Sequence, residues 1–503
     1  MEFSHVVEPA LTASTDLLVM VAFGDPTKDP TFRTLDTATG KGLSEAARSE
    51  SFEGKAGQSL VFWANGAVKA KRIAVLGAGP KAEVELPALR DVGAIAAQIA
   101  NKVGAKSLAL VVPSFGAPRE PAAIQMVAEG SILGTYKFGR YLTGAEAKKS
   151  PSLQHFGFIV DTKGKKPTAA QTRAFKGAVE RAEVVAAAIS RARDMVNEPA
   201  AYMTPTQVAA EAEAIAKKHD TVTVHVLGAK KCEDLGMGMF LAVGKGSDQE
   251  PKLVHLVYKP KKAKKKIALI GKGVTFDSGG YSLKPSNAME DMKVDMSGAA
   301  AVIAAMDAIA TLGCEHEVHA VAACCENLVS GRAYKLGDVL TSMDGTTVEI
   351  NNTDAEGRLT LGDAITYVRT KIQPDEMFDF ATLTGACMVA LGPYTAGVMS
   401  DHDGLCRAWL AAAERAGEDM WRLPLTSRLR EQLKSPVADM RNTGDRFGGA
   451  ITAGLFLKTF AKDTPWVHVD IAGPASISSS RPCQPRGGTG FAVASIVEYL
   501  AKR

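Results

Sequence analysis

Short apolar runs alternate with segments of helical periodicity along this chain, and no other feature restricts its fold as much. Leu17–Phe23, Arg72–Gly77 and Ser107–Val112 have the composition of buried strands. Between the last two, Val92–Val103 has the apolar spacing of a helix. Beyond residue 200, strand-like and Ala-rich helical segments continue to alternate. The pattern predicts an α/β fold.

The length of 503 residues is too great for one compact core, so we expect two or more domains. Asp161–Pro167 is a polar, basic break, and Ala170–Met195 after it has the composition of one long helix. We therefore expect an N-terminal α/β domain over residues 1–168, a connecting helix over residues 169–195 and a second domain over residues 196–503. Thr206–Lys218, capped by Thr204, and Ser297–Leu312 are predicted as further helices.

The stretch Asn351–Leu359, with the sequence NNTDAEGRL, places Asp354, Glu356 and Arg358 at every second position. If the segment is extended, the three side chains leave one face, successive ones roughly 6.6 Å apart. Two carboxylates placed in this way could share a pair of divalent cations, and the guanidinium beside them could bind an anion. A solvated turn with an internal ion pair is the alternative.

A second polar stretch, GKGVTFDSGG over residues 271–280, comes directly after the apolar run Lys266–Ile270, which we expect to be a buried strand. Its glycines allow sharp turns and close approach to a ligand. Lys284, Asp291 and Asp295 follow. Ligands of α/β sheets usually bind at strand ends, and carboxylates suit Mg²⁺, Mn²⁺ or Zn²⁺. The two stretches together predict a carboxylate-rich metal centre, although spacing alone does not separate Asp295 from Glu290 or Asp291.

These motifs resemble the leucyl aminopeptidase family of dinuclear metallopeptidases, also called cytosol aminopeptidases. The resemblance covers roughly residues 190–500 and rests on NTDAEGRL, GKGVTFDSGG and MKVDMSGAA, with further matches at residues 326–334, 381–386 and 448–454. It implies a smaller N-terminal α/β domain joined by the long helix to a larger C-terminal catalytic α/β/α domain with a mixed central sheet. The first third of the chain resembles the family only in length and general character.

The resemblance also implies two divalent metal ions per subunit, Mn²⁺ or Zn²⁺, with ligands at Lys272, Asp277, Asp295, Asp354 and Glu356. Asp277 and Glu356 would bridge the metals, Asp354 would complete one site, and Lys272 with Asp295 the other. Four carboxylates balance the charge of two divalent ions. A lysine ligand must be neutral, and deprotonating it at pH 7 costs roughly 4 to 5 kcal/mol, which the cations must offset.

The implied reaction is metal-assisted hydrolysis of peptides, in which a water bridging two metals ~3.5–4 Å apart loses its proton and attacks the scissile carbonyl. Lys284 would stabilise the oxyanion, and Arg358 would bind a bicarbonate ion that serves as general base. A free, neutral α-amine of the substrate would bind the metal on the Lys272 side and Asp295. The resemblance places the substrate against Met292, Thr382, Leu383, Thr384, Gly385, Ala472 and Ala475, and an apolar pocket would favour Leu or Met.

The sequence departs from the family pattern after Asp470–Gly473, at Pro474 and at Ser476–Pro482, and this puts fine specificity in doubt. A preference for Cys-Gly dipeptides is therefore an alternative within the same enzyme class. An inactive structural relative is another alternative, against which the complete set of ligands, Lys284 and Arg358 argue.

The lysine-rich run over residues 259–266 raises the alternative of a nucleic-acid-binding or architectural role. The run is short, lacks interleaved aromatic residues and lies between apolar strands, so we expect a solvated hairpin loop. Gly77-Ala78-Gly79 lacks the full GxGxxG pattern, so a tight turn is expected there. His316 and His319 do not form an HExxH motif, and we expect structural roles on a strand for both.

Net charge is +4, so nothing draws the whole chain toward nucleic acid. Seven scattered cysteines without CxxC pairs favour reduced, mostly buried thiols in a cytoplasmic protein. No secretory signal and no apolar run of membrane-spanning length is apparent, so we expect a soluble protein. The resemblance further implies a homohexamer that acts on peptides with a free N-terminal amine.

Overall fold

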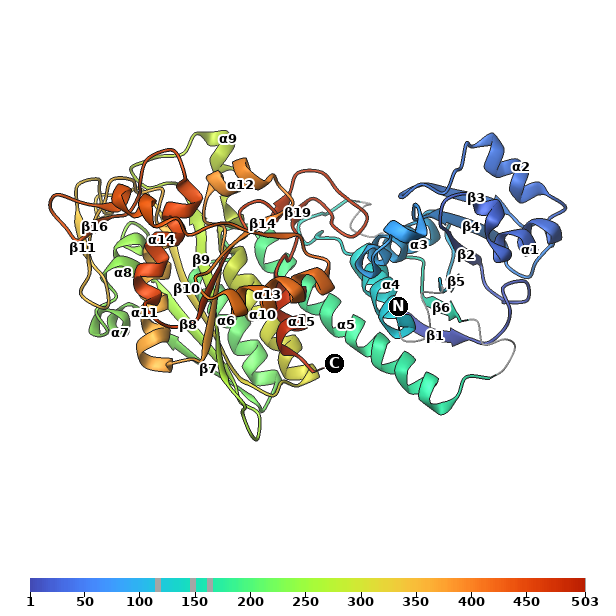
Figure 1. The fold of residues 1–503 in the computed structure, drawn as a ribbon, viewed down its shortest axis with the longest axis horizontal. Coiled ribbons are helices and arrows are strands. Elements are labelled where there is room, and N and C mark those ends of the chain that lie inside the picture. Colours follow the sequence, from blue (N-terminus) through green and yellow to red (C-terminus); the bar gives the residue numbers. More distant parts are fainter. Residues whose placement is uncertain (114–118, 145–150, 161–165, 503) are drawn as a thin grey trace. The chain divides into compact units, whose positions relative to one another are not determined.

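The structure, a computed structural model, describes residues 1–113, 119–144, 151–160 and 166–502. The chain forms two compact units, which are described separately (Figure 1). The first comprises Met1–Ala186 with Ser479–Pro485, and the second comprises Ala187–Ser478 with Arg486–Arg503. Residues 161–165 of the expected polar break lie outside the described residues, so the division at residues 168 and 195 stays a prediction.

The N-terminal unit is built on a six-stranded sheet in the order β1-β6-β5-β2-β4-β3. All neighbouring pairs are parallel except the edge strand β3, which is antiparallel to β4. The strands are β1 (Glu2–Val6), β2 (Leu17–Ala22), β3 (Ser59–Trp63), β4 (Arg72–Gly77), β5 (Ser107–Val111) and β6 (His155–Ile159).

Helices cover both faces of this sheet, so β2 is buried on both sides and its alternate side chains enter two different cores. Leu18 and Met20 join the core beneath α1 (Pro30–Ala38) and α2 (Gly42–Ser49). Leu17 and Val19 join the core beneath α3 (Leu89–Lys102) and α4 (Glu120–Leu133). An uninterrupted apolar run is the sequence signature of such a strand.

Two helices lead into the second unit. α5 (Ala169–Asn197) is 29 residues long and contains the point at which the two units divide. α6 (Pro205–Lys218) begins with proline, and the Thr204 hydroxyl accepts a hydrogen bond from the Gln207 N–H at 3.4 Å, as the capping residues predicted.

The second unit is organised around an eight-stranded mixed sheet in the order β15-β14-β17-β13-β9-β10-β8-β7, which confirms the predicted fold class. Its centre is four parallel strands, β17 (Trp466–Asp470), β13 (Glu376–Ala381), β9 (Lys266–Asp277) and β10 (Glu317–Asn327). On one side β8 (Lys252–Tyr258) is antiparallel to β10, and β7 (Val222–Leu227) is antiparallel to β8. On the other side β14 (Ala396–Met399) is antiparallel to β17, and β15 (Met420–Arg422) completes the edge.

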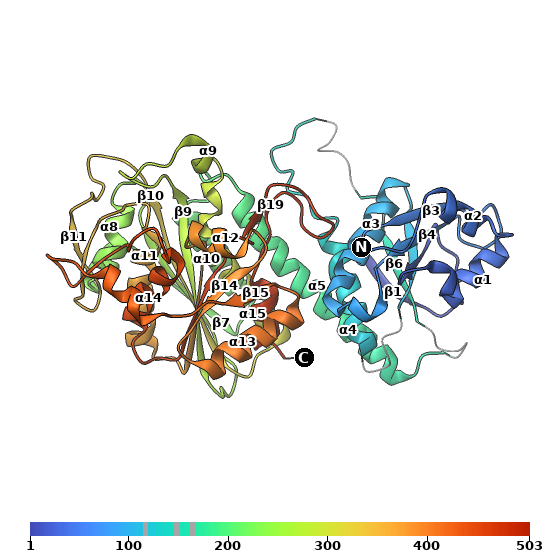
Figure 2. The ribbon, with the colours of Figure 1, turned by 45° about the horizontal axis from the view of Figure 1, so that its top comes forward.

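Helices sandwich the mixed sheet (Figures 1 and 2). One face carries α8 (Gly238–Gly244), α11 (Gly357–Tyr367) and α14 (Gly449–Ala461), whose apolar side chains share one core. The other carries α10 (Ser297–Leu312), α13 (Asp403–Ala416) and α15 (Val493–Leu500), in contact with one another. The smaller elements are α7 (Ala229–Asp234), α9 (Ser286–Met289), α12 (Gly385–Leu391), the sheet of β11 (Val339–Thr341), β12 (Thr347–Glu349) and β16 (Met440–Arg441), and the pair β18 (Ser476–Ile477) and β19 (Gly487–Gly488).

One helical stretch, Ser286–Leu312, is long and apolar enough to cross a membrane by length and composition alone. Its most apolar window is 78% buried inside the unit, as expected of a helix at the centre of a folded core. Among the described residues no other helix meets both criteria.

Two sequence expectations about local structure are wrong. β9 continues through Asp277, so residues 271–277 of the glycine-rich stretch form the second half of the strand and only residues 278–280 follow it. The lysine-rich run is not a hairpin loop either, because β8 and β9 do not pair with each other and both pair with β10 between them. The first expectation failed because a strand can contain glycines where another backbone packs closely. The second failed because the sequence does not show that a later strand, β10, is inserted between β8 and β9.

Candidate metal centre and active site

The predicted metal ligands meet at the carboxyl ends of the central parallel strands. Lys272 and Asp277 lie on β9, and Thr382 follows β13 directly. Asp295 lies in the 3₁₀ turn Met292–Met296 just before α10, and that turn packs against β9. Glu356 immediately precedes α11. In α/β folds this edge of the sheet is where ligands bind.

The segment from Asp354 to Arg358 is not extended, contrary to the geometry assumed from the sequence. Glu356 has helical dihedral angles of φ −73° and ψ −35°, and α11 begins at Gly357. Asp354 and Glu356 therefore converge through a turn and a helix start. Glycine at 357 leaves room for Lys272, because a Cβ there would lie 2.7 Å from Lys272 Nζ and the lysine side chain would have to shift. The extended geometry assumed from the alternation is therefore wrong, although the predicted side chains still lie close together.

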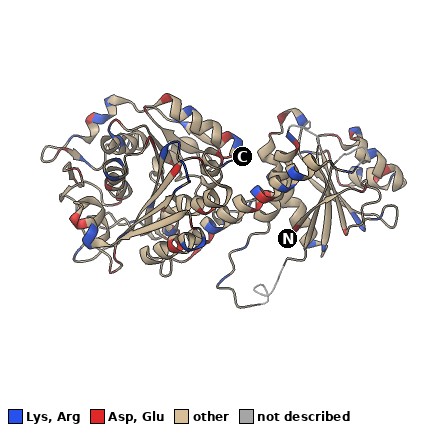
Figure 3. Ribbon diagram, turned by 90° about the horizontal axis from the view of Figure 1, so that it is seen from below, with Lys and Arg blue, Asp and Glu red and all other residues tan. Residues whose placement is uncertain are grey.

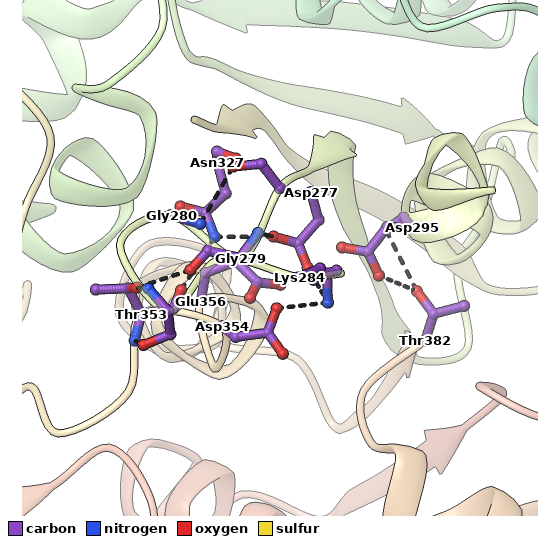
Figure 4. Close-up of polar contacts among 12 residues, drawn as sticks. Asp277, Gly279, Gly280, Lys284, Asp295, Asn327, Thr353, Asp354, Glu356 and Thr382 are labelled. Atoms are coloured by element: carbon purple, nitrogen blue, oxygen red, sulfur yellow. Dashed lines mark hydrogen bonds and ion pairs between the residues drawn. The ribbon is translucent and has the colours of Figure 1, made fainter. Parts of the chain in front are cut away.

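Two lysines bridge the carboxylates of the cluster. Figure 4 shows Lys284 between Asp277 and Asp354. Lys272 Nζ lies 2.7 Å from Asp295 Oδ1 and 2.8 Å from Glu356 Oε1, and all three side chains are almost fully buried. Lys284 Nζ lies 2.9 Å from Asp277 Oδ2 and 2.5 Å from Asp354 Oδ1. Four acids and two bases are thus paired within one site.

The electrostatics of the cluster follow from burial and close charges. Burial alone would lower the pKa of Lys272, but Asp295, Glu356 and Asp277 raise it above its usual value. Burial raises the pKa of both Asp295 and Glu356, and neighbouring carboxylates add to the effect. In the absence of another cation, the ammonium groups of Lys272 and Lys284 neutralise the carboxylates of the cluster.

The site also offers oxygen atoms that no hydrogen bond satisfies. Asp295 Oδ2 and Glu356 Oε2 are buried and have no partner among the described residues. One oxygen each from Asp277, Asp354 and Glu356 lie within 4.8 Å of one another, the only such group of acidic, histidine or cysteine residues in the described part of the chain. Unpartnered buried carboxylate oxygens are costly unless a cation binds them. The donor set therefore fits divalent metal ions that accept oxygen ligands.

A cavity of about 660 Å³ opens onto this cluster. It is lined by all five predicted ligands, by Lys284 and Arg358, and by six predicted substrate residues, namely Met292, Thr382, Leu383, Thr384, Gly385 and Ala472. Ala475 is not among the lining residues and is buried. Glu290 and Asp291 are exposed and do not line the cavity, so the structure selects Asp295 from the three acids that spacing left open.

Comparison with known proteins identifies the family. Residues 190–497 match the cytosol aminopeptidase family, catalytic domain, and residues 19–145 match the N-terminal domain of the same family. The chain belongs to the cytosol aminopeptidase family. It is therefore a metal-dependent aminopeptidase, a hydrolase, as the motif resemblance predicted.

Relatives of this cytosol aminopeptidase match over nearly their whole length. A probable cytosol aminopeptidase of Syntrophotalea carbinolica is 40% identical over 495 residues, covering 98% of each chain. One from Persephonella marina is 40% identical over 486 residues, covering 94% of this chain and 93% of the relative. Among solved structures, a mutant of tomato leucine aminopeptidase has a TM-score of 0.89 at 34% identity, covering 99% of this chain and 96% of that one. The bottromycin maturation enzyme BotP in complex with Mn has a TM-score of 0.82 at 33% identity, with coverage of 96% and 98%.

Arg358 lies in the first turn of α11 and is buried. Its Nη1 donates a hydrogen bond to the Asn442 carbonyl at 2.8 Å, whereas its Nε has no partner among the described residues. Burial lowers the pKa of this guanidinium to about 10, so it still carries its charge at neutral pH. A buried cation with an unpartnered donor, lining the metal-site cavity, is suited to binding a small anion.

Several residues that shape the cytosol aminopeptidase site escaped the sequence prediction. Asn327, fully buried at the end of β10, donates hydrogen bonds from Nδ2 to Asp277 Oδ1 at 2.8 Å and to the Thr353 carbonyl at 3.0 Å. Asn442 donates from Nδ2 to the Asn352 carbonyl at 2.6 Å and accepts from the Asn351 N–H at 2.9 Å. Both orient the metal-binding segments. Asn327 belongs to one of the quoted family matches, but nothing in the pattern around it indicated this role.

The alternative roles drawn from the lysine-rich run and the histidines gain no support. Lys259, Lys264 and Lys265 pair with Glu317, Glu315 and Glu376, so much of the positive charge of the run is compensated. Figure 3 shows basic and acidic residues interspersed along the chain. His319 lies on β10, as predicted, and bonds to His255 and Glu317. His316 lies in a bend just before β10, so its predicted place on a strand is wrong.

Proposed function

We propose that this protein removes the N-terminal residue, preferably Leu or another apolar residue, from peptides with a free amine. Two divalent ions per subunit, Mn²⁺ or Zn²⁺, would be bound by Lys272, Asp277, Asp295, Asp354 and Glu356. The observation that carries the proposal is the convergence of four carboxylates in one cavity, two of them with buried oxygens that have no partner.

The arrangement of the cluster supports a division of these ligands between two ions. Asp277, Asp354 and Glu356 each lie close to a lysine and to the other two acids, and the family resemblance assigns the bridging role to Asp277 and Glu356. Asp354 would complete the site on the Lys284 side, and Asp295 with Lys272 the other. Lys272 would give up its proton to become a ligand, and a divalent ion beside it would favour that loss.

When bound, the ions would supply an activated water as nucleophile and polarise the scissile carbonyl. Lys284 stays protonated, since Asp277 and Asp354 raise its pKa against the opposing effect of burial. Its ammonium, at the wall of the cavity, would stabilise the oxyanion as negative charge develops. Arg358 would bind a bicarbonate ion that accepts the proton of the attacking water.

Substrate selection would come from the walls of the cavity. Met292, Thr382, Gly385 and Ala472, which line the cavity, are proposed around the first side chain together with Ala475, which does not line it, and Leu383 and Thr384 would offer backbone groups. The apolar lining would favour Leu or Met over charged residues, with each methylene contributing ~1–3 kcal/mol of discrimination. Comparing turnover of Leu-Gly with that of Cys-Gly tests this preference.

The deciding experiment is hydrolysis of leucine p-nitroanilide by protein that has been stripped of metal with a chelator and then reloaded with Mn²⁺ or Zn²⁺. We expect no turnover before reloading, recovery after it, and no turnover of the N-acetylated substrate. Glu356→Ala should abolish turnover, because Glu356 is a shared ligand. Lys335→Ala, an exposed lysine paired with Asp338, provides a matched surface control that should keep full activity. Folded, metal-loaded wild-type protein without turnover would contradict the proposal.

The proposal includes a homohexamer located in the cytoplasm. The names of the relatives support the location, and the resemblance to the family supports the assembly. Analytical ultracentrifugation should give a mass six times that of the chain. A monomer or dimer at micromolar concentration would contradict the hexamer without affecting the proposed chemistry.

A further inference from the structure

Beneath the cavity, one buried carboxylate accepts hydrogen bonds from two of its walls. Asp470, the last residue of β17, is fully buried. Its Oδ1 accepts from the N–H groups of Leu383 at 3.2 Å, Thr384 at 3.4 Å and Ala472 at 3.2 Å. Its Oδ2 accepts from the Thr384 hydroxyl at 2.7 Å. Leu383, Thr384 and Ala472 all line the cavity, whereas Asp470 does not.

These bonds set the conformation of the segment that follows β13. The Thr384 hydroxyl donates to Asp470, which leaves its oxygen free to accept from the Cys387 N–H at 3.0 Å and so to cap α12. The same carboxylate ties Ala472, which follows β17, to this segment. Both walls of the cavity are thus anchored at one point.

Asp470 is in turn backed by a second buried group of polar residues. His468 lies two residues earlier on the same face of β17, opposite Asp379 of β13. His468 Nδ1 is 2.6 Å from Asp379 Oδ1, and the Trp466 indole N–H donates to Asp379 Oδ2 at 2.7 Å. Burial would lower the pKa of His468, but Asp379 and Asp470 raise it above its usual value. Burial raises the pKa of Asp470, and the neighbouring His468 opposes this shift.

We propose that Asp470 is a positioning residue for the peptidase reaction: it fixes the backbone of Leu383 and Thr384 relative to Ala472, so that the cavity walls are preorganised to receive the peptide. The inference rests on the proposed substrate-binding role of those residues. Asp470 touches neither the proposed metal ligands nor the substrate, and acts only through the groups that it orients. Preorganised walls lower the cost of ordering them when substrate binds.

The test compares Asp470→Ala with Asp470→Asn. Alanine leaves three buried N–H groups and one hydroxyl without their acceptor, so the walls loosen. We expect kcat/KM for leucine p-nitroanilide to fall at least about tenfold, mainly through a higher KM, with the bound metal per subunit unchanged. Asparagine keeps an oxygen where Oδ1 lies, and its amide can donate to the Thr384 hydroxyl, so kcat/KM should stay within about threefold of wild type.

Asp363→Ala is the matched control. Asp363 is also fully buried, and its two oxygens accept from the N–H groups of Phe240 at 2.9 Å and Met343 at 2.8 Å, none of which lines the metal-site cavity. Its loss should lower the melting temperature as Asp470→Ala does, while kcat/KM of the folded protein is kept. Equal loss of kcat/KM in both alanine variants would overturn the proposal, as would an Asp470→Asn variant no better than Asp470→Ala.

Hydrogen–deuterium exchange provides a readout that does not depend on turnover. The amides of Leu383 and Thr384 should exchange faster in Asp470→Ala than in wild type or in Asp363→Ala. Unchanged exchange would overturn the anchoring role. Wild-type protein that lacks turnover would instead refute the proposed function, and the exchange measurement would still decide whether Asp470 anchors the segment.

Discussion

At the scale of single residues, the site is a set of opposite charges that are largely withdrawn from water, except that 34% of the Asp354 side chain is exposed. Lys272 and Lys284 each lie between two carboxylates, and each contacts a different pair. The two lysines differ in exposure, because the Lys284 side chain is 15% exposed and the Lys272 side chain only 4%. The more accessible lysine is thus the one suited to meet the substrate, and the enclosed one is suited to bind metal.

Replacing Lys284 by methionine tests this division. The substitution keeps most of the side-chain volume but removes the charge that would stabilise the oxyanion. We expect kcat to fall about 10²- to 10³-fold. The metal content should be unchanged, since every proposed ligand remains and the ammonium no longer competes for Asp277 and Asp354. Steady-state kinetics with metal analysis by emission spectrometry measures both, and a kcat within threefold of wild type would refute the role.

At the scale of elements, the position of Asp295 depends on how closely α10 approaches the sheet. A Cβ on Gly298, in the first turn of α10, would lie 2.0 Å from the Phe380 carbonyl oxygen of β13 and 2.9 Å from the Lys272 nitrogen of β9. Both neighbours are backbone atoms of central strands, so neither can move aside cheaply. The glycine allows the contact between helix and strands that brings Asp295 to Lys272.

Gly298→Ala should therefore lower the free energy of unfolding by at least about 2 kcal/mol, because the helix start must shift away from two strands. Gly177→Ala on α5 is the matched helical control: a Cβ there meets nothing within 4 Å, and the change should be neutral or stabilising by up to about 1 kcal/mol. Urea denaturation followed by circular dichroism measures both. Equal stability of the two variants would show that the close approach is not needed.

Three strands also bring together a chain of polar groups away from the cavity. His255 on β8 lies 2.9 Å from His319 on β10 and 3.2 Å from the Tyr367 hydroxyl on α11, with His225 on β7 beside it. Glu317 forms a hydrogen bond with Nε2 of His319. Burial lowers the pKa of His319, Glu317 raises it, and the charges of Lys266 and Lys259 lower it further. Burial, with further contributions from His319 and His225, lowers the pKa of His255 to about 3.

This shift makes stability depend on pH with a definite sign. Because the pKa of His255 is lower in the folded than in the unfolded protein, the unfolded state binds more protons between about pH 6.5 and 3. The part of the free energy of unfolding that depends on neutral His255 is therefore fully present above about pH 6.5. It is lost as the pH falls toward 3, and the total loss is roughly 3–5 kcal/mol. Unfolding measured at several pH values should show a shallower loss in His255→Gln than in wild type, and identical slopes would refute the assignment.

At the scale of the whole molecule, all seven cysteines are buried and none forms a disulfide, in agreement with the expectation from their spacing. Burial raises the pKa of Cys324 and of Cys387 to about 12, which keeps these thiols protonated and unreactive. The chain thus relies on its hydrophobic cores and on neither disulfides nor reactive thiols for its stability.

Titration with Ellman's reagent should accordingly detect almost no thiol in the native protein and seven per chain in guanidinium chloride. The native protein without denaturant is the internal control. One or more rapidly reacting thiols in the native state would show that a cysteine is accessible, and fewer than seven in denaturant would reveal a disulfide.

The sequence by itself determined the α/β class and the extents of α6 and α10, and it singled out the residues that we propose as metal ligands. It could do so because periodicity and capping act locally, and because NTDAEGRL and GKGVTFDSGG carry their chemistry within a few positions. The tertiary structure decided how those residues meet. Glu356 stands at a helix start and Asp277 at a strand end, so only the sheet brings their oxygens within reach of one another. Asn327, Asn442 and Asp470 acquire their roles through bonds to residues far away in the chain, and local patterns contain no information about such partners.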